Sequence, residues 1–230
     1  MTVALVVGAG LLGALVGCAL PVVTERVPAR RSVLVAPFPE VRAALRTVGG
    51  WVTVAVTAGL FAAVTARFAH DWVCPAYLVL TAALVALSVI DLRLFLLPNR
   101  IVYPLAGVSV VLLTVGAALD HDLDAMPRAL LGAGAAFVVF AVLHLVSPRS
   151  MGFGDVKLAF VLGLFLGYLG WGEVVLGLFL GFLYGAVVGV VLIAARLRTR
   201  RDHVPFGPFL AAGTLTCVLV GQTVLDWYRG

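Results

Sequence analysis

Two aspartates could carry chemistry, because each one borders a strongly apolar segment. Asp91 ends the mainly apolar stretch 87–90, and Asp155 follows the glycine-rich stretch 151–154. Charged residues near membrane-spanning segments are costly and are therefore functional candidates by default. Two carboxyl groups held close together share one proton, because like charges at that distance cannot both ionise. The ionised carboxyl can activate a water that attacks a peptide carbonyl, while its partner polarises that carbonyl and protonates the leaving amine. This is the chemistry of an aspartyl protease.

Each aspartate also has a purely structural explanation. Asp155 could cap the helix that follows it, since a carboxylate accepts hydrogen bonds from free helix N–H groups. Asp91 could form an ion pair with Arg93 or Arg100. If the two aspartates form a catalytic pair, neither can be assigned as the acid or the base, because such a pair titrates as a unit.

The residues next to Asp155 allow similar alternatives. Gly152 and Gly154 could simply form a turn, or they could let a substrate backbone approach closely, because glycine has no Cβ. Lys157 could anchor the helix end at the membrane surface or tune the carboxylates, and the anchor is the favoured interpretation.

The elements that would position these residues are membrane helices. Of the 230 residues, 63% are hydrophobic and 12% are charged, whereas soluble domains average about 45–50% apolar and about 25% charged residues. Lipid is therefore the expected solvent for much of the chain. The net charge of +5 could suggest nucleic acid. However, the basic residues lie in short runs between apolar segments, so we expect a lipid bilayer and no nucleic acid.

A membrane helix needs about 20 mostly apolar residues, and the chain offers eight such segments. Helices are expected because a spanning segment must satisfy its backbone hydrogen bonds internally. The predicted fold is an all-α, polytopic membrane helix bundle of about eight transmembrane helices, which forms a single integral membrane domain over residues 1–230. The predicted spans are approximately 2–23, 48–66, 73–91, 101–119, 128–146, 156–170, 172–195 and 206–226.

The distribution of Lys and Arg predicts the orientation, because cytoplasmic loops are enriched in both. With eight spans, the loops after spans 1, 3, 5 and 7 share one side and hold 13 of the 16 basic residues. We expect this side, with both aspartates, to face the cytoplasm. The basic side holds Arg26, Arg30, Arg31, Arg42, Arg46, Arg93, Arg100, Arg149, Lys157, Arg196, Arg198, Arg200 and Arg201, and the other side holds Arg67, Arg128 and Arg229 with Asp120, Asp122 and Asp124.

Glycines recur every four residues on the predicted sixth and seventh spans. This spacing places them on one helix face, where neighbouring backbones can approach closely. Close packing is the favoured interpretation, and a hinge or substrate groove is the alternative. These glycines are Gly163, Gly167, Gly177, Gly181, Gly185 and Gly189.

The sequence indicates neither a metal nor a cofactor. Cys18, Cys74 and Cys217 are far apart, so we expect small apolar fillers rather than zinc ligands. The four histidines, at positions 70, 121, 144 and 203, show no metal-ligand spacing. No basic residue precedes the first apolar run, so a cleaved signal peptide is not expected.

Three motifs resemble, in the same order, those of the prepilin (type IV leader) peptidases, a family of GxGD membrane aspartyl proteases. Residues 152–155 read Gly-Phe-Gly-Asp, within a longer Met-Gly-x-Gly-Asp-x-Lys-Leu match. Residues 90–93 (Ile-Asp-Leu-Arg) and 97–99 (Leu-Pro-Asn) resemble the first aspartate motif. Residues 204–210 (Val-Pro-Phe-Gly-Pro-Phe-Leu) resemble a later segment. The resemblance covers roughly residues 85–215.

The resemblance implies an aspartic endopeptidase that removes the short basic leader from type IV prepilins or pseudopilins, just after a glycine. Cleavage would occur at the cytoplasmic face of the bacterial inner membrane, on a substrate that itself carries a transmembrane helix. By this likeness Asp91 and Asp155 are the catalytic pair. The supporting or substrate-binding residues would be Gly152, Gly154, Lys157, Pro98 and Asn99.

The chain departs from the family pattern in its first fifty residues. Family members often carry a Gly-Ser-Phe-Leu-Asn-type motif there, followed by a cytoplasmic domain with two CxxC pairs, whereas the loop after the first predicted span here has no cysteine. Many members also N-methylate the new amino terminus with S-adenosylmethionine. Because that activity is associated with the N-terminal part, the resemblance does not carry it over, and we expect a compact, peptidase-only form.

Two other functions stay open. A transporter or channel would use intramembrane carboxylates and glycine-rich helices, but its site should lie near the bilayer midplane, whereas both aspartates lie at the edges of predicted spans. A non-catalytic assembly factor of a pilus or secretion system would keep the motifs for packing alone. Replacing each aspartate by asparagine separates these alternatives from a protease.

Overall fold

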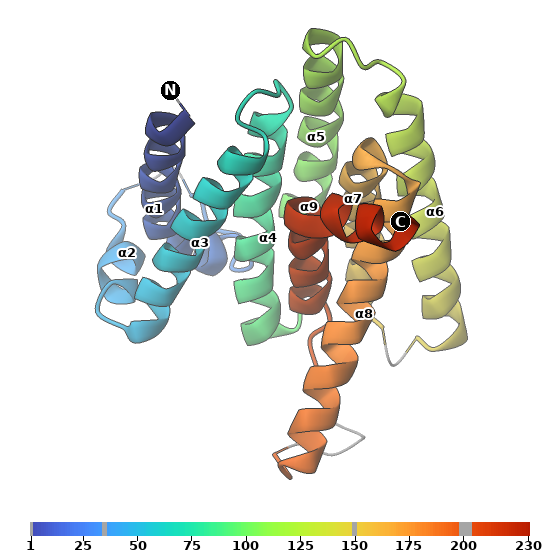
Figure 1. The fold of residues 1–230 in the computed structure, drawn as a ribbon. Coiled ribbons are helices and arrows are strands. Elements are labelled where there is room, and N and C mark those ends of the chain that lie inside the picture. Colours follow the sequence, from blue (N-terminus) through green and yellow to red (C-terminus); the bar gives the residue numbers. More distant parts are fainter. Residues whose placement is uncertain (1, 34–35, 149–150, 198–203) are drawn as a thin grey trace. The chain divides into compact units, whose positions relative to one another are not determined.

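The structure is a computed structural model that describes residues 2–33, 36–148, 151–197 and 204–230, which contain nine helices and no strand (Figure 1). The prediction of an all-α, polytopic membrane protein is confirmed, since seven of these helices are long and apolar enough to cross a membrane. Arg149, Arg198, Arg200, Arg201 and His203 lie outside the described residues. The helices are α1 (Thr2–Arg26), α2 (Pro39–Ala44), α3 (Val48–Arg67), α4 (Cys74–Leu94), α5 (Asn99–Leu119), α6 (Ala125–Val146), α7 (Phe153–Leu169), α8 (Trp171–Ala194) and α9 (Gly207–Arg229).

The eight predicted spans correspond to α1 and to α3 through α9. The predicted span 156–170 is α7, which has 17 residues and is about 25 Å long at 1.5 Å per residue, near the lower limit for crossing a bilayer. Both α6 and α7 begin three residues before their predicted starts, at Ala125 and Phe153. The first turn of α6 includes Pro127, which a helix tolerates at this place because its first N–H groups have no partner within the helix.

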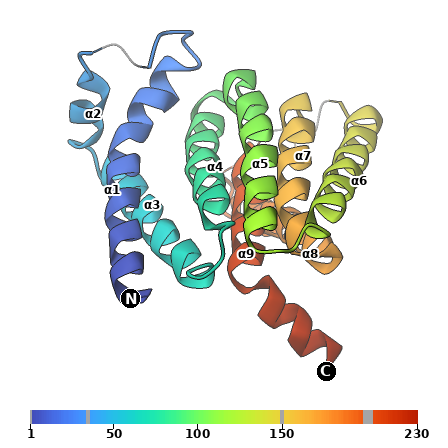
Figure 2. The same ribbon diagram turned by 90° about the horizontal axis from the view of Figure 1, so that it is seen from above.

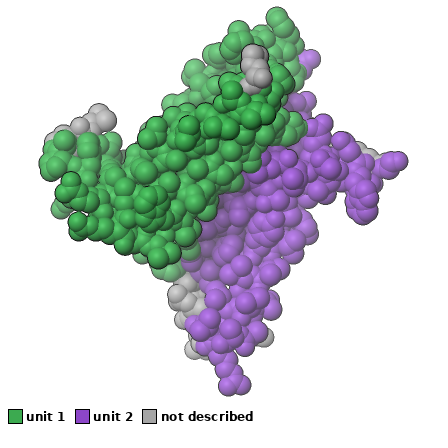
Figure 3. Space-filling view, turned by 60° about the vertical axis from the view of Figure 1, so that its left-hand side comes forward, with its two compact units in different colours: residues 1–123 green, residues 124–230 purple. Residues whose placement is uncertain are grey.

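The chain forms two compact units, Met1–Leu123 and Asp124–Gly230 (Figure 3), and each is described by itself. The prediction of one integral membrane domain stays a prediction. In the first unit, α1 and α3 pack along one another, and the short helix α2 contacts both (Figures 1 and 2). Helix α4 packs against each of the other three long helices, α1, α3 and α5. The helix that carries Asp91 is therefore central to its unit.

Helix α7 has the corresponding place in the second unit, where it packs against α6, α8 and α9. Every residue from Val161 to Tyr168 is buried. A helix that is apolar on all sides is suited to such a central position, because no face has to meet solvent. The helix that carries Asp155 is therefore also central to its unit.

The regularly spaced glycines lie at helix contacts. A Cβ added at Gly163 of α7 would lie 2.7 Å from the Ala136 Cβ of α6, and one at Gly181 of α8 would lie 2.9 Å from the Leu210 Cδ2 of α9. These distances are too short for real carbon atoms, so the packing interpretation is confirmed at these positions. Around Gly189, a Cβ would meet no described atom within 4 Å. Gly167 and Gly177 are enclosed in the same way as Gly163 and Gly181.

Candidate active site

Asp91 lies in the last turn of α4 and is buried, with 5% of its surface exposed. The helix ends at Phe95, which adopts the left-handed conformation (φ 52°, ψ 41°) and donates its N–H to the Asp91 carbonyl over 2.9 Å. A left-handed residue is a common way to end a helix, although glycine usually occupies it. The predicted end of the span at Asp91 was three residues too early, so its carboxyl belongs to a complete helical turn.

The predicted supporting residues Pro98 and Asn99 form the start of α5. Pro98 is buried and precedes the helix in an extended conformation (φ −66°, ψ 126°). Its carbonyl accepts a hydrogen bond from the Ile101 N–H over 2.9 Å. Asn99 is the first residue of α5 and is exposed. The connection that follows Asp91 therefore spans only residues 95–98. A short connection of this kind limits how far the two helix ends can separate.

Asp155 lies in the first turn of α7 and is also buried, with 7% of its surface exposed. Gly152 precedes the helix in an extended conformation, and its carbonyl accepts the Asp155 N–H over 3.1 Å. A Cβ on Gly152 would lie 3.6 Å from the Asp155 Oδ2. The exposed backbone of Gly152 thus lies next to the Asp155 carboxyl. This is expected if the glycine leaves room for a substrate backbone. The location also fits the helix-capping alternative, because a carboxylate is stabilised near a helix N-terminus.

Sequence reasoning missed His144 at this end of α7. Its Nδ1 lies 2.8 Å from the Met151 carbonyl oxygen, and its ring centroid lies 5.5 Å from that of Phe153. The Lys157 ammonium lies over the same ring, 4.9 Å from its centroid. A lone histidine in an apolar helix gave no signal in the sequence, because its partner is seven residues away in a connection between two helices.

The C-terminal motif provides a further aromatic contact in the second unit. Phe206 precedes α9, and its ring lies 6.4 Å from that of Phe140 and 5.1 Å from that of Phe182. Phe140 is fully buried. The Pro-Phe-Gly-Pro segment thus starts α9 against α6 and α8.

A cavity of about 160 Å³ with both polar and apolar lining residues lies near the end of α4 in the first unit. Val89 and Arg93, which flank Asp91 in the sequence, line it together with residues of α1, α2 and α3. The Arg93 guanidinium lies 3.9 Å from the Glu25 carboxylate at the end of α1. Both side chains are about half exposed, so this pair contributes little to stability. It does indicate that α1 and α4 end on the same side of the unit.

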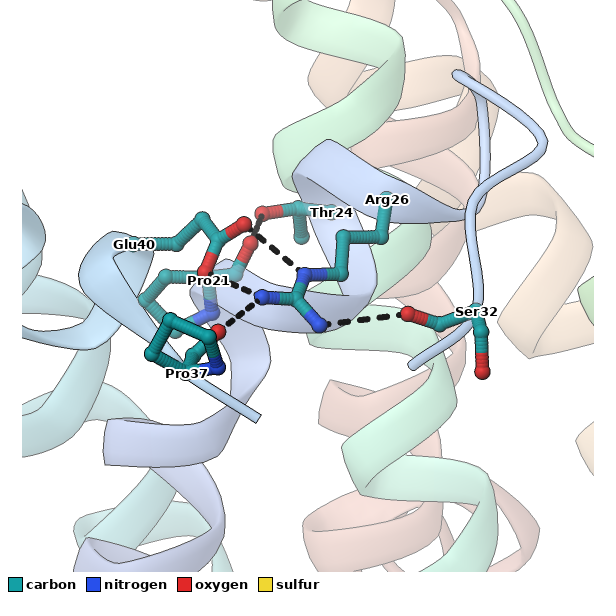
Figure 4. Close-up of polar contacts among 6 residues, drawn as sticks. All are labelled: Pro21, Thr24, Arg26, Ser32, Pro37 and Glu40. Carbon is teal, nitrogen blue, oxygen red and sulfur yellow. Dashed lines mark hydrogen bonds and ion pairs between the residues drawn. The ribbon is translucent and has the colours of Figure 1, made fainter. Parts of the chain in front are cut away.

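Arg26 organises the connection between α1 and α3, which the sequence indicated only as a basic loop (Figure 4). The guanidinium is buried and donates to both Glu40 carboxylate oxygens, over 2.8 and 3.0 Å. It also donates to the carbonyls of Ser32 (3.2 Å) and Pro37 (2.5 Å) and lies over the Phe38 ring. The hydrogen bond from Arg26 lowers the pKa of Glu40 below its ordinary value of 4.5. Arg26 therefore fixes α2 to the end of α1.

Burial separates the two predicted aspartates from the other acidic residues. Among the Asp and Glu side chains that the structure describes, only Asp91 and Asp155 are buried. They lie in different units, so their pairing stays a prediction. Within the same described ranges, no group of three His, Cys, Asp or Glu side chains could hold a metal ion.

Comparison with known proteins finds the same family that the sequence motifs resemble. A model of the type IV leader peptidase family matches residues 78–190, which include both aspartates. The chain is 34% identical to a prepilin leader peptidase/N-methyltransferase of Aeromonas hydrophila over 75% of this chain and 59% of that protein. It is 31% identical to the protein of that name from Bacillus subtilis, over 75% and 66% of the two chains. The Pseudomonas aeruginosa relative is 34% identical over 75% and 58%.

The chain thus spans about three fifths of the length of the curated relatives that it matches. No solved structure matches it. The matched segment contains α5, α6 and α7, most of α4 and α8, and both predicted aspartate motifs. Through this segment the chain belongs to the type IV leader peptidase family.

Proposed function

We propose that this protein is a membrane-embedded aspartic endopeptidase that removes the leader from type IV prepilins or pseudopilins, with Asp91 and Asp155 as its catalytic pair. The observation that carries the proposal is the burial of these two carboxyls. They are the buried acids of the described residues, and both lie inside the segment that matches the family. Burying a carboxyl is costly, and chemistry is a reason for a protein to bear that cost twice.

Both carboxyls lie where a helix ends, which suits an attack on a peptide at the membrane boundary. Asp91 is in the last turn of α4, and Asp155 is in the first turn of α7. In the proposed reaction the ionised carboxyl takes a proton from a water, and the resulting hydroxide equivalent attacks the scissile carbonyl. The protonated carboxyl polarises that carbonyl and then gives its proton to the leaving amine. Gly152, Gly154, Lys157, Pro98 and Asn99 would form the surroundings of the pair.

The charges of the first unit support a site that faces the cytoplasm of the bacterial inner membrane. Exposed arginines of the α1–α3 connection (Arg30, Arg31, Arg42 and Arg46) lie at the end of the unit where the last turn of α4 carries Asp91. At the opposite end, the backbone N–H of Trp72 donates to the Asp120 carboxylate over 2.9 Å. This arrangement agrees with the enrichment of basic residues in cytoplasmic loops. A prepilin with its transmembrane helix in the same bilayer would be the substrate.

The proposal is tested by cleavage in membranes. The protein is co-expressed with tagged candidate prepilins, and the mobility of each prepilin is compared for the wild type, Asp91→Asn and Asp155→Asn. We expect both variants to lose cleavage by at least about a thousandfold, because each carboxyl takes part in proton transfer and neither has a substitute. Sequencing should place the new pilin terminus one residue past a glycine.

Asp226→Asn serves as the matched control, since Asp226 is an exposed acid on α9. It should cleave as the wild type does. Normal amounts of inserted Asp91→Asn protein that still cleave prepilins would contradict the proposal. Failure of the wild type to cleave several correctly inserted prepilins would favour a non-catalytic role in pilus or secretion assembly.

A further inference from the structure

The first turn of α7 holds Asp155, and the residue that precedes this turn has no side chain. The residue before the helix is Gly152, which supplies no side-chain cap. The second residue of the helix is also a glycine, Gly154. Glycine loses more conformational freedom on folding than any other residue. A contact from another helix would therefore help to hold the stretch from Met151 to Asp155 in one conformation.

His144 supplies such a contact from the last turn of α6. Its Nδ1 lies 2.8 Å from the Met151 carbonyl oxygen, directly before Gly152. A carbonyl oxygen can only accept a hydrogen bond, so Nδ1 must carry the proton. The half-buried imidazole is therefore held in the Nδ1–H form, in which it donates to the backbone.

The second contact of His144 is with Phe153, the residue between the two glycines. The ring centroids are 5.5 Å apart with an interplanar angle of 54°. The Lys157 ammonium lies 4.9 Å from the centroid of the same Phe153 ring. Aromatic rings at this separation attract one another, and a cation over a ring face is also favourable. Phe153 is about half exposed, so these two neighbours fix a ring that burial alone does not fix.

We propose that His144 is a positioning residue for Asp155, which acts through the Met151 carbonyl and the Phe153 ring. This inference rests on the proposed function, because it assigns His144 a role in placing a catalytic carboxyl. The chain of contacts is short: His144 holds Met151, the Gly152 carbonyl accepts the Asp155 N–H over 3.1 Å, and the carboxyl lies beside Gly152. An error of about 1 Å in the place of a reacting group can reduce the rate about a hundredfold.

Two substitutions separate the donor from the bulk of the side chain. His144→Asn keeps a donor, because its Nδ2 occupies nearly the place of the imidazole Nδ1. His144→Leu keeps a side chain of similar size and removes the donor. In the full-length protein we expect His144→Leu to lower kcat for prepilin cleavage about tenfold and to change KM little. His144→Asn should stay within about twofold of the wild type.

Hydrogen–deuterium exchange provides a readout that does not depend on catalysis. Amides of residues 151–158 should exchange about fivefold faster in His144→Leu, because one hydrogen bond that resists local opening is lost. They should exchange at the wild-type rate in His144→Asn. His70→Leu, which changes an exposed histidine of the first unit, is the control and should alter neither readout.

The outcomes are distinguishable. Wild-type exchange and wild-type kcat in His144→Leu would overturn the proposal, and so would an Asn variant that is as impaired as the Leu variant. If the wild type itself cleaves no prepilin, the proposed function fails. The exchange rates would then still show whether His144 anchors the turn before Asp155.

Discussion

At the scale of single residues, burial is the property that marks functional candidates. The eleven acidic residues of the chain are chemically similar in the sequence. In the structure, Asp91 and Asp155 are buried, whereas Glu40 is half-buried and bound by Arg26. An acid that is paired with arginine has a structural explanation, and its contribution to stability depends on pH.

The pairing of Glu40 predicts a loss of stability in acid. The hydrogen bond from Arg26 lowers the pKa of Glu40 below 4.5 in the folded protein. Its stabilising contribution is therefore complete above pH 4.5 and is lost as the pH falls through the lower folded value. We expect the thermal midpoint of the detergent-solubilised wild type to fall more steeply below pH 4.5 than that of Glu40→Gln.

Glu25→Gln is the control for this measurement. Glu25 forms an exposed ion pair with Arg93 at 3.9 Å, and exposed pairs of this kind contribute little. Its pH profile should follow that of the wild type. An identical acid profile for Glu40→Gln and the wild type would contradict the interpretation that Arg26 and Glu40 hold α2 in place.

At the scale of helices, small residues determine how closely neighbours pack. A Cβ added at Gly132 of α6 would lie 2.8 Å from the Gly163 carbonyl oxygen and 3.0 Å from the Gly167 Cα. Gly134 of the same helix has no described atom within 4 Å of an added Cβ. Two glycines that are two residues apart thus lie on different faces of one helix. They offer a matched pair for testing whether close packing stabilises the second unit.

We expect opposite effects from alanine at these two positions. Gly132→Ala should destabilise the protein by about 1–3 kcal/mol, because the new methyl group forces α6 and α7 apart. Gly134→Ala should be neutral or should stabilise the protein by up to about 1 kcal/mol, because alanine favours the helix. Thermal unfolding in one detergent measures both. Equal midpoints for the two variants would show that the contact between α6 and α7 does not limit stability.

At the scale of the whole molecule, charge defines the two ends of the first unit. Exposed arginines are concentrated at the end where α1 and α4 finish, and Asp120 and Asp122 lie at the other. In the second unit, the Arg128 guanidinium donates to the carbonyls of Gly167 and Tyr168 at the end of α7. Arg128 is one of the few basic residues outside the predicted cytoplasmic loops. It donates hydrogen bonds to carbonyls that have no partner within their own helix.

The predicted orientation can be tested by labelling single cysteines with a membrane-impermeant maleimide. Arg42→Cys and Asp122→Cys change exposed residues of opposite ends of the first unit. In a background with Cys18, Cys74 and Cys217 replaced by alanine, Asp122→Cys should react in intact spheroplasts, and Arg42→Cys only after lysis. The physical reason is that basic loops stay in the cytoplasm. The reverse pattern would contradict the proposed location of Asp91 at the cytoplasmic face.

The sequence by itself determined the helical spans and singled out Asp91 and Asp155 as candidates for the site. Both depend on local information, because a bilayer requires about 20 apolar residues and internally satisfied backbone hydrogen bonds. The helix α2 escaped prediction although Pro39 and Glu40 are typical of a helix start. Its six residues are too few to produce a pattern, and its location depends on Arg26.

Only the tertiary structure decided which side chains are buried and which partners they have. The contacts of Arg26 with Glu40, of His144 with Met151, and of Gly163 with α6 join segments that the sequence separates by loops of undefined path. A loop's path depends on the packing of the helices that it connects. That packing is decided by the contacts formed and the conformational entropy lost over the whole unit. Residue types can therefore indicate candidates for a site. The burial and the partners that determine the reactivity of a carboxyl arise only on folding.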